Sequence, residues 1–254
     1  MLRKCWLFLL GGLLAGTNSA YAQDAIATDR PAFTASSIVV PQGTLQFENG
    51  VARTITEGDS MFDFPETLVR FGVASKTELR VAAPDYLDAF GSASPVSGFG
   101  DVLVGVKQQL GPTPGGFDVS AILSLSLPSG SKGISSGGYD PQFQLPWSHA
   151  LTKNWTADGM FAAYWPTQGK RRNGTGQAAL EFDREITNSW DAFIEYNGEF
   201  AQRGGPEHVI HFGTAYRFTS NQQIDLHVGF GLSSAAADQI IGVGYSFRFR
   251  VLGR

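Results

Sequence analysis

The stretch Gly-Tyr-Ser-Phe-Arg-Phe-Arg (residues 244–250) alternates strictly between two kinds of side chain. Its odd-numbered positions carry aromatic rings, and its even-numbered positions carry glycine, serine or arginine. Because successive side chains of a β-strand point to opposite faces, such a segment has one apolar face and one polar face. A strand of this kind belongs to a sheet that meets different environments on its two sides. The same alternation recurs along the chain and limits the folds that it can adopt.

The alternation predicts twelve strands of about 8–13 residues, close to the length that a tilted strand needs to cross a bilayer. One outward-facing apolar residue from each predicted strand is, in chain order, Phe47, Phe71, Val81, Val104, Leu123, Leu145, Phe161, Phe182, Ile194, Phe212, Leu226 and Phe247. No stretch in this part of the chain reaches 18 consecutive apolar residues, so membrane-spanning helices are excluded.

The first residues have the pattern of a secretory signal. Arg3 and Lys4 precede an apolar run at 5–15, and Ala20-Tyr21-Ala22 is a small-x-small cleavage motif. We therefore predict a cleaved signal peptide over about 1–22. The only cysteine, Cys5, would leave with it, so the mature chain has no disulfide.

The connections between the predicted strands alternate in length. Short connections are expected at 75–76, 111–116, 152–154, 188–189 and 220–221. Longer ones are expected at about 55–65, 84–99, 128–140, 166–175, 201–207 and 233–238. Outer-membrane barrels have short periplasmic turns and longer external loops, whereas a soluble β-sandwich, the rival fold, has no such rule.

The predicted fold is therefore all-β, a single antiparallel transmembrane β-barrel of about 12 strands with a polar lumen. We assign residues 43–254 to the barrel. Residues 23–42 show no sustained period, so we predict a periplasmic N-terminal segment that can enter the lumen. The expected location is the outer membrane.

The polar faces of the strands supply candidate lumen-lining residues. These are Glu48, Arg70, Glu78, Arg80, Asp101, Lys107, Glu181, Asp183, Glu185, Glu195, Glu199, Arg217 and Arg248. Two interpretations remain open: a salt-bridged interior that closes the lumen, or a selective constriction with walls of opposite charge. The N-terminal motif Asp29-Arg30-Pro31 can join either arrangement if its segment folds into the barrel mouth.

Other classes of function find little support. The formal net charge is −4 and no basic run is present, which argues against a nucleic-acid partner. The sequence has no nucleophile elbow, P-loop or dinucleotide fingerprint, so we predict no catalytic residues and no cofactor. His208 and His211 fall on opposite faces of a strand, so no metal site is predicted.

Several stretches carry a family resemblance. Residues 28–34 (TDRPAFT), followed by residues 43–50 (GTLQFENG), resemble the opening of a family of Gram-negative outer-membrane proteins. That family is named for the meta-pathway of phenol degradation and is often labelled simply transporter. Similar stretches follow at 68–73, 77–81, 98–101 and 127–130, so the resemblance covers most of the mature chain. It implies an outer-membrane barrel involved in the passage of hydrophobic or aromatic compounds.

We therefore predict an outer-membrane channel or facilitator for the passive passage of small solutes, aromatic or hydrophobic ones among them. Its expected partners are outer-membrane lipid, the barrel-assembly machinery and a small solute that the sequence does not identify. One alternative is a structural barrel without transport. The other is a lipid-modifying enzyme that would use Ser148 and His149, although adjacent strand residues point apart.

Overall fold

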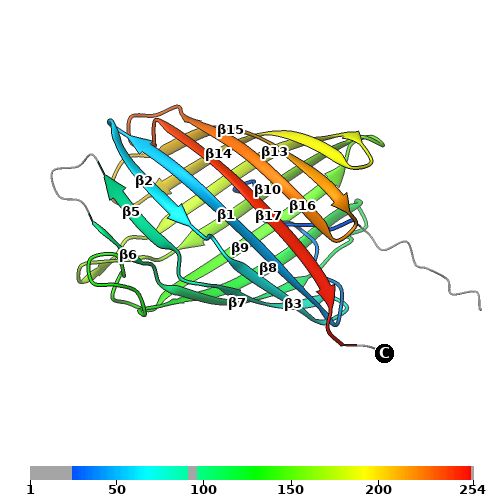
Figure 1. The fold of residues 1–254 in the computed structure, drawn as a ribbon, viewed down its shortest axis with the longest axis horizontal. Coiled ribbons are helices and arrows are strands. Elements are labelled where there is room, and N and C mark those ends of the chain that lie inside the picture. The colour runs from blue at the N-terminus through cyan, green and yellow to red at the C-terminus, as the bar shows by residue number, and fades with distance from the viewer. Residues whose placement is uncertain (1–24, 91–95, 253–254) are drawn as a thin grey trace, which may run out of the picture.

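The computed structural model describes residues 25–90 and 96–252, and these form a closed antiparallel β-barrel (Figure 1). The last strand, β17 (Gln239–Arg250), pairs with the first, β1 (Thr44–Thr56), over twelve consecutive residue pairs and thereby closes the sheet. In the described ranges, no helix is long and apolar enough to cross a membrane. The predicted signal at 1–22 lies outside these ranges.

The barrel wall has twelve positions, as predicted. Nine are single strands: β1, β17, and β8 (Phe117–Leu127), β9 (Asp140–Ala150), β10 (Trp155–Tyr164), β13 (Thr175–Thr187), β14 (Trp190–Ala201), β15 (Glu207–Thr219) and β16 (Gln222–Gly231). Three are interrupted strands: β2 (Asp59–Phe64) with β3 (Leu68–Ala74), β4 (Thr77–Ala82) with β5 (Tyr86–Phe90), and β6 (Ser97–Phe99) with β7 (Val102–Gln109). A small hairpin of β11 (Thr167–Gln168) and β12 (Arg171–Arg172) lies in the loop after β10.

Two predicted loops, at 55–65 and 84–99, are wrong in part. The first is a turn at Glu57-Gly58 followed by β2, and the second contains β5 and β6. Aromatic pairs between neighbouring strands hold this extension together, since the rings of Phe64 and Tyr86 are 5.5 Å apart and those of Tyr86 and Phe99 are 5.2 Å apart. Cross-strand aromatic pairs of this kind stabilise a sheet.

The remaining connections follow the expected alternation. Ser75-Lys76, Asn188-Ser189 and Ser220-Asn221 each join two strands at one end of the barrel, which we call the turn end. Residues 128–139 and 165–174 connect strands at the opposite end, which we call the loop end. The first strand starts and the last strand finishes at the turn end, so both ends of the barrel wall lie there.

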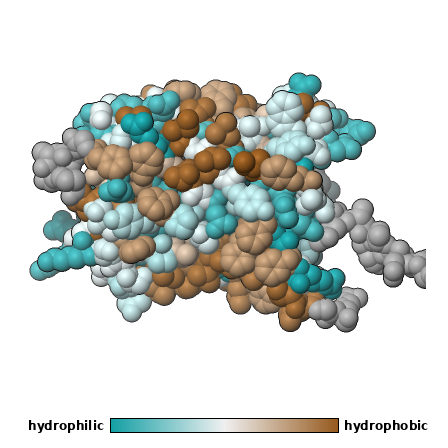
Figure 2. Space-filling view, in the orientation of Figure 1, coloured by the Kyte–Doolittle hydropathy of each residue, from teal (hydrophilic) through white to brown (hydrophobic). Residues whose placement is uncertain are grey.

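The outer surface of the barrel is apolar. Large outward side chains of most strands remain exposed, among them Leu123, Phe161 and Leu226. Figure 2 shows hydrophobic side chains spread over the middle of one face, with the most hydrophilic ones nearer its two ends. Exposed Trp155 and Trp190 lie toward the turn end, and exposed Trp165 and Phe200 toward the loop end. An apolar surface this extensive is typical of a protein that lipid surrounds.

The interior is mostly polar, with one apolar cluster. Gln46, Glu48, Arg70, Glu78 and Lys107 are fully buried inside the barrel. The apolar cluster comprises Ala35, Ile122, Met160, Ala162 and Ala179, with Tyr164 packed against it. Because Ala35 precedes β1, the N-terminal segment contributes to this interior.

Candidate functional site

Residues 25–41 cross the lumen and return to the end where they began. The amide of Ile26 donates to the carbonyl of Ser220 in a turn-end connection, at 2.9 Å. The middle of the segment reaches β14, where the amide of Phe33 donates to Glu195 at 2.9 Å. Near its far end, the amide of Val40 donates to Glu78 at 2.7 Å. The segment therefore spans the lumen between opposite parts of the wall.

On one side, the segment meets a group that we call the paired cluster: Asp29, Glu48, Arg70, Glu78, Arg80 and Lys107. Arg70 lies at its centre, with Nε 2.8 Å from Glu78 Oε1 and Nη1 2.9 Å from Glu48 Oε1. Asp29 forms ion pairs with Arg80, with Arg70 at 3.2 Å and with Lys107 at 3.5 Å. Three carboxylates thus face three cations, so the cluster carries no net charge.

The register of the strands places like charges opposite each other, and the paired cluster compensates them. Arg70 of β3 lies directly opposite Arg80 of β4, and like charges opposite each other destabilise a sheet. Glu78 of β4 lies opposite Lys107 of β7 and also bonds both arginines. Buried charges are stable only when they are paired and hydrogen-bonded. Asp29 supplies the third carboxylate, so the N-terminal segment completes the cluster.

Arg30 occupies a slot between two strands that carry glycine at the same level. Gly50 of β1 pairs with Gly244 of β17, and a Cβ on either residue would overlap the Arg30 side chain. In this slot Arg30 forms ion pairs with Glu66 at 2.6 Å and with Asp225 at 3.4 Å. The glycine pair therefore provides the space in which the second charged residue of the segment binds the wall.

Glu195 anchors the segment on the opposite wall. Its carboxylate accepts hydrogen bonds from the amides of Phe33 and Thr34 and from the Thr34 hydroxyl, at 2.9, 2.8 and 2.7 Å. His211 Nδ1 lies 3.0 Å from the same carboxylate, and its Nε2 lies 2.9 Å from Nδ1 of His227. This buried carboxylate is thus held by four neighbouring groups.

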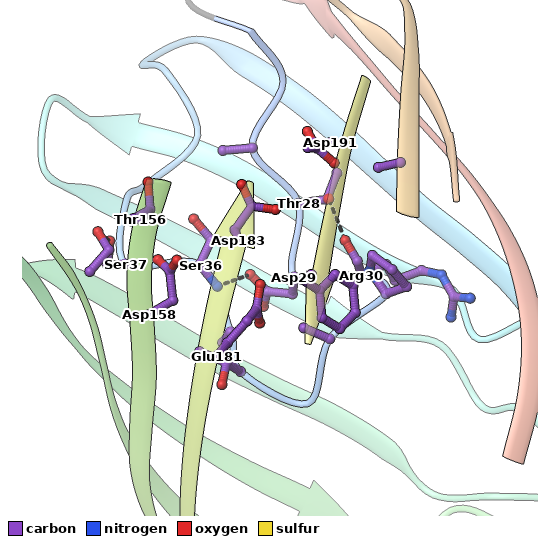
Figure 3. Close-up of a pocket in the computed structure, with 18 of the residues that line it drawn as sticks. Thr28, Asp29, Arg30, Ser36, Ser37, Thr156, Asp158, Glu181, Asp183 and Asp191 are labelled. Carbon is purple, nitrogen blue, oxygen red and sulfur yellow. Dashed lines mark hydrogen bonds between the residues drawn. The ribbon is translucent and has the colours of Figure 1, made fainter. Parts of the chain in front are cut away.

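Next to Glu195 is a second group of carboxylates, which we call the acidic wall: Asp158, Glu181 and Asp183. They lie on the adjacent strands β10 and β13, beside the N-terminal segment (Figure 3). Within the described ranges, none of the three has a hydrogen-bond or ion-pair partner, in contrast to the carboxylates of the paired cluster. The nearby cation Arg217 is already paired with Asp191.

The segment leaves space on both sides. A cavity of about 370 Å³ toward the turn end is lined by the segment, the acidic wall, Asp191, Arg217 and Phe193. Another cavity, of about 400 Å³, lies toward the loop end and is lined by Asp101, Asp140, Tyr164 and Glu199, among others. Both volumes are in the range of small-molecule sites.

The other predicted lumen residues lie near the ends of the barrel. Asp101 was expected within a strand but lies in the break between β6 and β7, where its carboxylate accepts the amides of Gly130 and Ser136. Partial burial alone would raise the pKa of Asp101, but the Ser135 hydroxyl and these amides hold that pKa below its ordinary value. Asp101 therefore organises a loop as a carboxylate.

Three further predicted residues occupy different positions. Glu199 lines the loop-end cavity. Glu185 lies beside the β13–β14 turn, where the pairing register shifts. Arg248 is buried and donates to Asn221 and Ser220, so it fastens a turn-end connection. Pro31 of the N-terminal motif lines the turn-end cavity.

Sequence reasoning missed several lumen residues. Glu66, which pairs with Arg30, lies between two strands and gives no alternation signal. Ile122 and Met160 are apolar, yet both point into the lumen and pack against Ala35. Ile122 lies between Ser120 and Ser124 on the polar phase of its strand, and that phase was the signal that could have identified it.

The residues proposed for an enzyme do not come together. Ser148 points into the lumen and shares a hydrogen bond of 2.7 Å with Ser37. His149 points outward, where its ring stacks on Phe117 with 4.4 Å between centroids. His208 and His211 also lie on opposite faces, bonded to Tyr196 and Glu195 respectively. Among the described residues, no three potential ligands are grouped so that they could hold a metal ion.

Comparison with known proteins gives a family and a fold. Residues 28–249 match the model of a family described as "Putative MetA-pathway of phenol degradation". No curated protein matches the chain.

Among solved structures, an outer-membrane channel from Pseudomonas putida F1 superposes with a TM-score of 0.65 at 13% identity, over 86% of this chain and 100% of that one. The NanC porin superposes with a TM-score of 0.57 at 12% identity, over 80% of this chain and 98% of that one. The KdgM porin superposes with a TM-score of 0.54 at 14% identity, over 81% of this chain and 99% of that one. At these identities the likeness concerns the fold, which is that of outer-membrane barrel channels.

Proposed function

The chain belongs to the family of the MetA-pathway of phenol degradation, and on this premise we propose that it forms a passive channel for small solutes in the outer membrane. The observation that carries the proposal is a closed barrel with an apolar outside and a polar lumen that holds a cavity toward each end. A purely structural barrel has no need for two cavities of solute size. By the length rule for connections, the turn end faces the periplasm.

The N-terminal segment acts as the plug of this channel. It lies between the two cavities and binds both walls, through Asp29 on one side and through Phe33 and Thr34 on the other. Both ends of the segment lie at the turn end, so it can leave the lumen toward the periplasm without breaking a wall strand. Passage of a solute then requires that these contacts open.

Conductance measurements test the plug directly. The chain without its signal is compared in planar bilayers with a variant that lacks residues 25–41. We expect small and infrequent currents from the complete chain and a severalfold larger conductance from the deletion variant. Equal currents from the two proteins would contradict the plug.

Liposome swelling tests the solute range. Vesicles containing the deletion variant are exposed to phenols, aromatic acids, small sugars and alkanols, with empty vesicles as the reference. Swelling with small aromatic solutes is the expected result. No swelling with any solute would favour the alternative of a structural barrel. As a control for folding, the boiled protein should migrate more slowly on a denaturing gel than the unboiled protein.

A further inference from the structure

The acidic wall is an arrangement that the fold alone does not explain. Asp158 of β10 lies directly opposite Glu181 of β13, and Glu181 lies directly opposite Glu195 of β14. Like charges directly opposite each other destabilise a sheet. Glu195 is compensated by the N-terminal segment and by His211, but the other two carboxylates have no such compensation.

Glu181 is the middle one of the three carboxylates that lie opposite one another, Asp158, Glu181 and Glu195. Its exposed fraction is 8%, it lines the turn-end cavity, and no described residue donates a hydrogen bond or an ion pair to it. Figure 3 shows Glu181 beside Asp158 and Asp183 at the edge of the space next to the N-terminal segment. A buried carboxylate without a partner is costly unless it takes up a proton or a ligand supplies the missing positive charge.

Among the described residues that line the cavity, no cation is free to fill this role. Arg217 is paired with Asp191, and Arg30 with Glu66 and Asp225. The cavity also has an apolar side, because the buried ring of Phe193 lines it together with Ala35 and Ala215. A positive charge and an apolar body are therefore both accommodated within about 370 Å³.

We propose that the turn-end cavity binds a small organic cation, with its ammonium group at Glu181 and its apolar part toward Phe193. A divalent metal fits less well, since the described carboxylates do not form a group of metal ligands. As an account of which solutes the channel prefers, this inference rests on the proposed function. Binding, however, is measurable without any transport.

The test uses the chain without its signal, folded in detergent, and titration calorimetry with three probes that share a phenyl ring. Benzylammonium carries the positive charge, benzyl alcohol is neutral and benzoate is negative. Ammonium chloride serves as a fourth probe without the apolar body. The variants are Glu181→Gln and Asp158→Asn, and Glu207→Gln is the matched control because Glu207 is exposed and lies outside the cavity.

We expect saturable binding of benzylammonium alone, weakened about tenfold or more in Glu181→Gln and less in Asp158→Asn, because a buried charged hydrogen bond is lost. The control variant should bind as the unaltered chain does. Absence of benzylammonium binding, or equal binding of benzyl alcohol, benzoate or ammonium chloride, would overturn the proposal. Conductance of the deletion variant reports on the channel itself, so failure of the cation site and failure of the channel are distinguishable.

Discussion

The two sides of the lumen differ in whether their carboxylates are paired with cations. In the paired cluster, three carboxylates and three cations bind one another, and Arg70, Glu48 and Glu78 are completely buried. In the acidic wall, three carboxylates on two adjacent strands have no cation of their own within the described ranges. One side is therefore complete without a ligand, and the other is not.

The N-terminal segment accounts for the difference. Asp29 completes the balance of the paired cluster, whereas at the other wall the segment offers only the amides and hydroxyl that bind Glu195. These donors stabilise one carboxylate by hydrogen bonds and leave Asp158, Glu181 and Asp183 facing the cavity. The N-terminal segment thus binds one side by ion pairs and the other by hydrogen bonds, and the cavity lies on the side where the charge is unbalanced.

The largest effect is expected from Arg70→Met in the paired cluster. This change leaves Glu48 and Glu78 buried with less positive charge, and breaking such a group costs roughly 3–5 kcal/mol of the free energy of unfolding. Urea-induced unfolding followed by tryptophan fluorescence measures the loss. The control is Arg171→Met, because Arg171 is exposed in the small hairpin β11–β12. A loss below 1 kcal/mol would mean that the cluster is more hydrated than its contacts indicate.

A smaller effect is expected from Glu195→Gln, at the second attachment of the segment. The glutamine retains an acceptor but loses the charge that strengthens hydrogen bonds from Phe33 and Thr34, which costs roughly 1–3 kcal/mol. Because that energy holds the plug, openings in planar bilayers should become more frequent. An unchanged opening frequency together with a lower stability would show that Glu195 stabilises the barrel but does not control channel opening.

The sequence was sufficient to predict the twelve wall positions because alternation is a local signal. Phe117 to Leu127 predicts β8 with the correct outward phase from its own residues alone. The phase also placed Glu48, Arg70 and Lys107 in the interior. Their partners could not be predicted, since Arg70 meets Glu78 and Asp29 only after the barrel closes and the N-terminal segment enters it.

The sequence-based predictions failed where contacts between residues far apart in the chain outweighed the local sequence pattern. A long loop was expected at 55–65, but the aromatic pairs of Phe62 with Phe90 and of Phe64 with Tyr86 extend the sheet there. Ile122 was not among the predicted lumen residues, yet it packs against Met160 and Ala35 inside the barrel. Such contacts join residues far apart in the chain, so no single stretch reveals them.

Gly244→Ala tests the slot that holds Arg30 beside the paired cluster. The added methyl group would overlap Arg30 and Asp225, and overpacking of this kind costs roughly 1–2 kcal/mol. Gly176→Ala is the matched control, because a Cβ at Gly176 meets no atom within 4 Å. We expect a lower urea midpoint for the first variant only. Equal midpoints would show that the Arg30 side chain can move aside without loss.

Glu181→Gln should give the smallest change and the opposite sign. It removes the like-charge opposition to Asp158 and Glu195 and breaks no hydrogen bond or ion pair, so the free energy of unfolding should rise by about 0.2–1 kcal/mol. Asp59→Asn removes the same charge from an exposed residue that lies opposite uncharged Thr56, so it should leave the free energy of unfolding unaltered. The measurement is made without any organic cation, because benzylammonium should stabilise the unaltered chain and not the variant. A loss of stability in Glu181→Gln would mean that Glu181 has a partner within the barrel, and the contrast between the two sides of the lumen would then disappear.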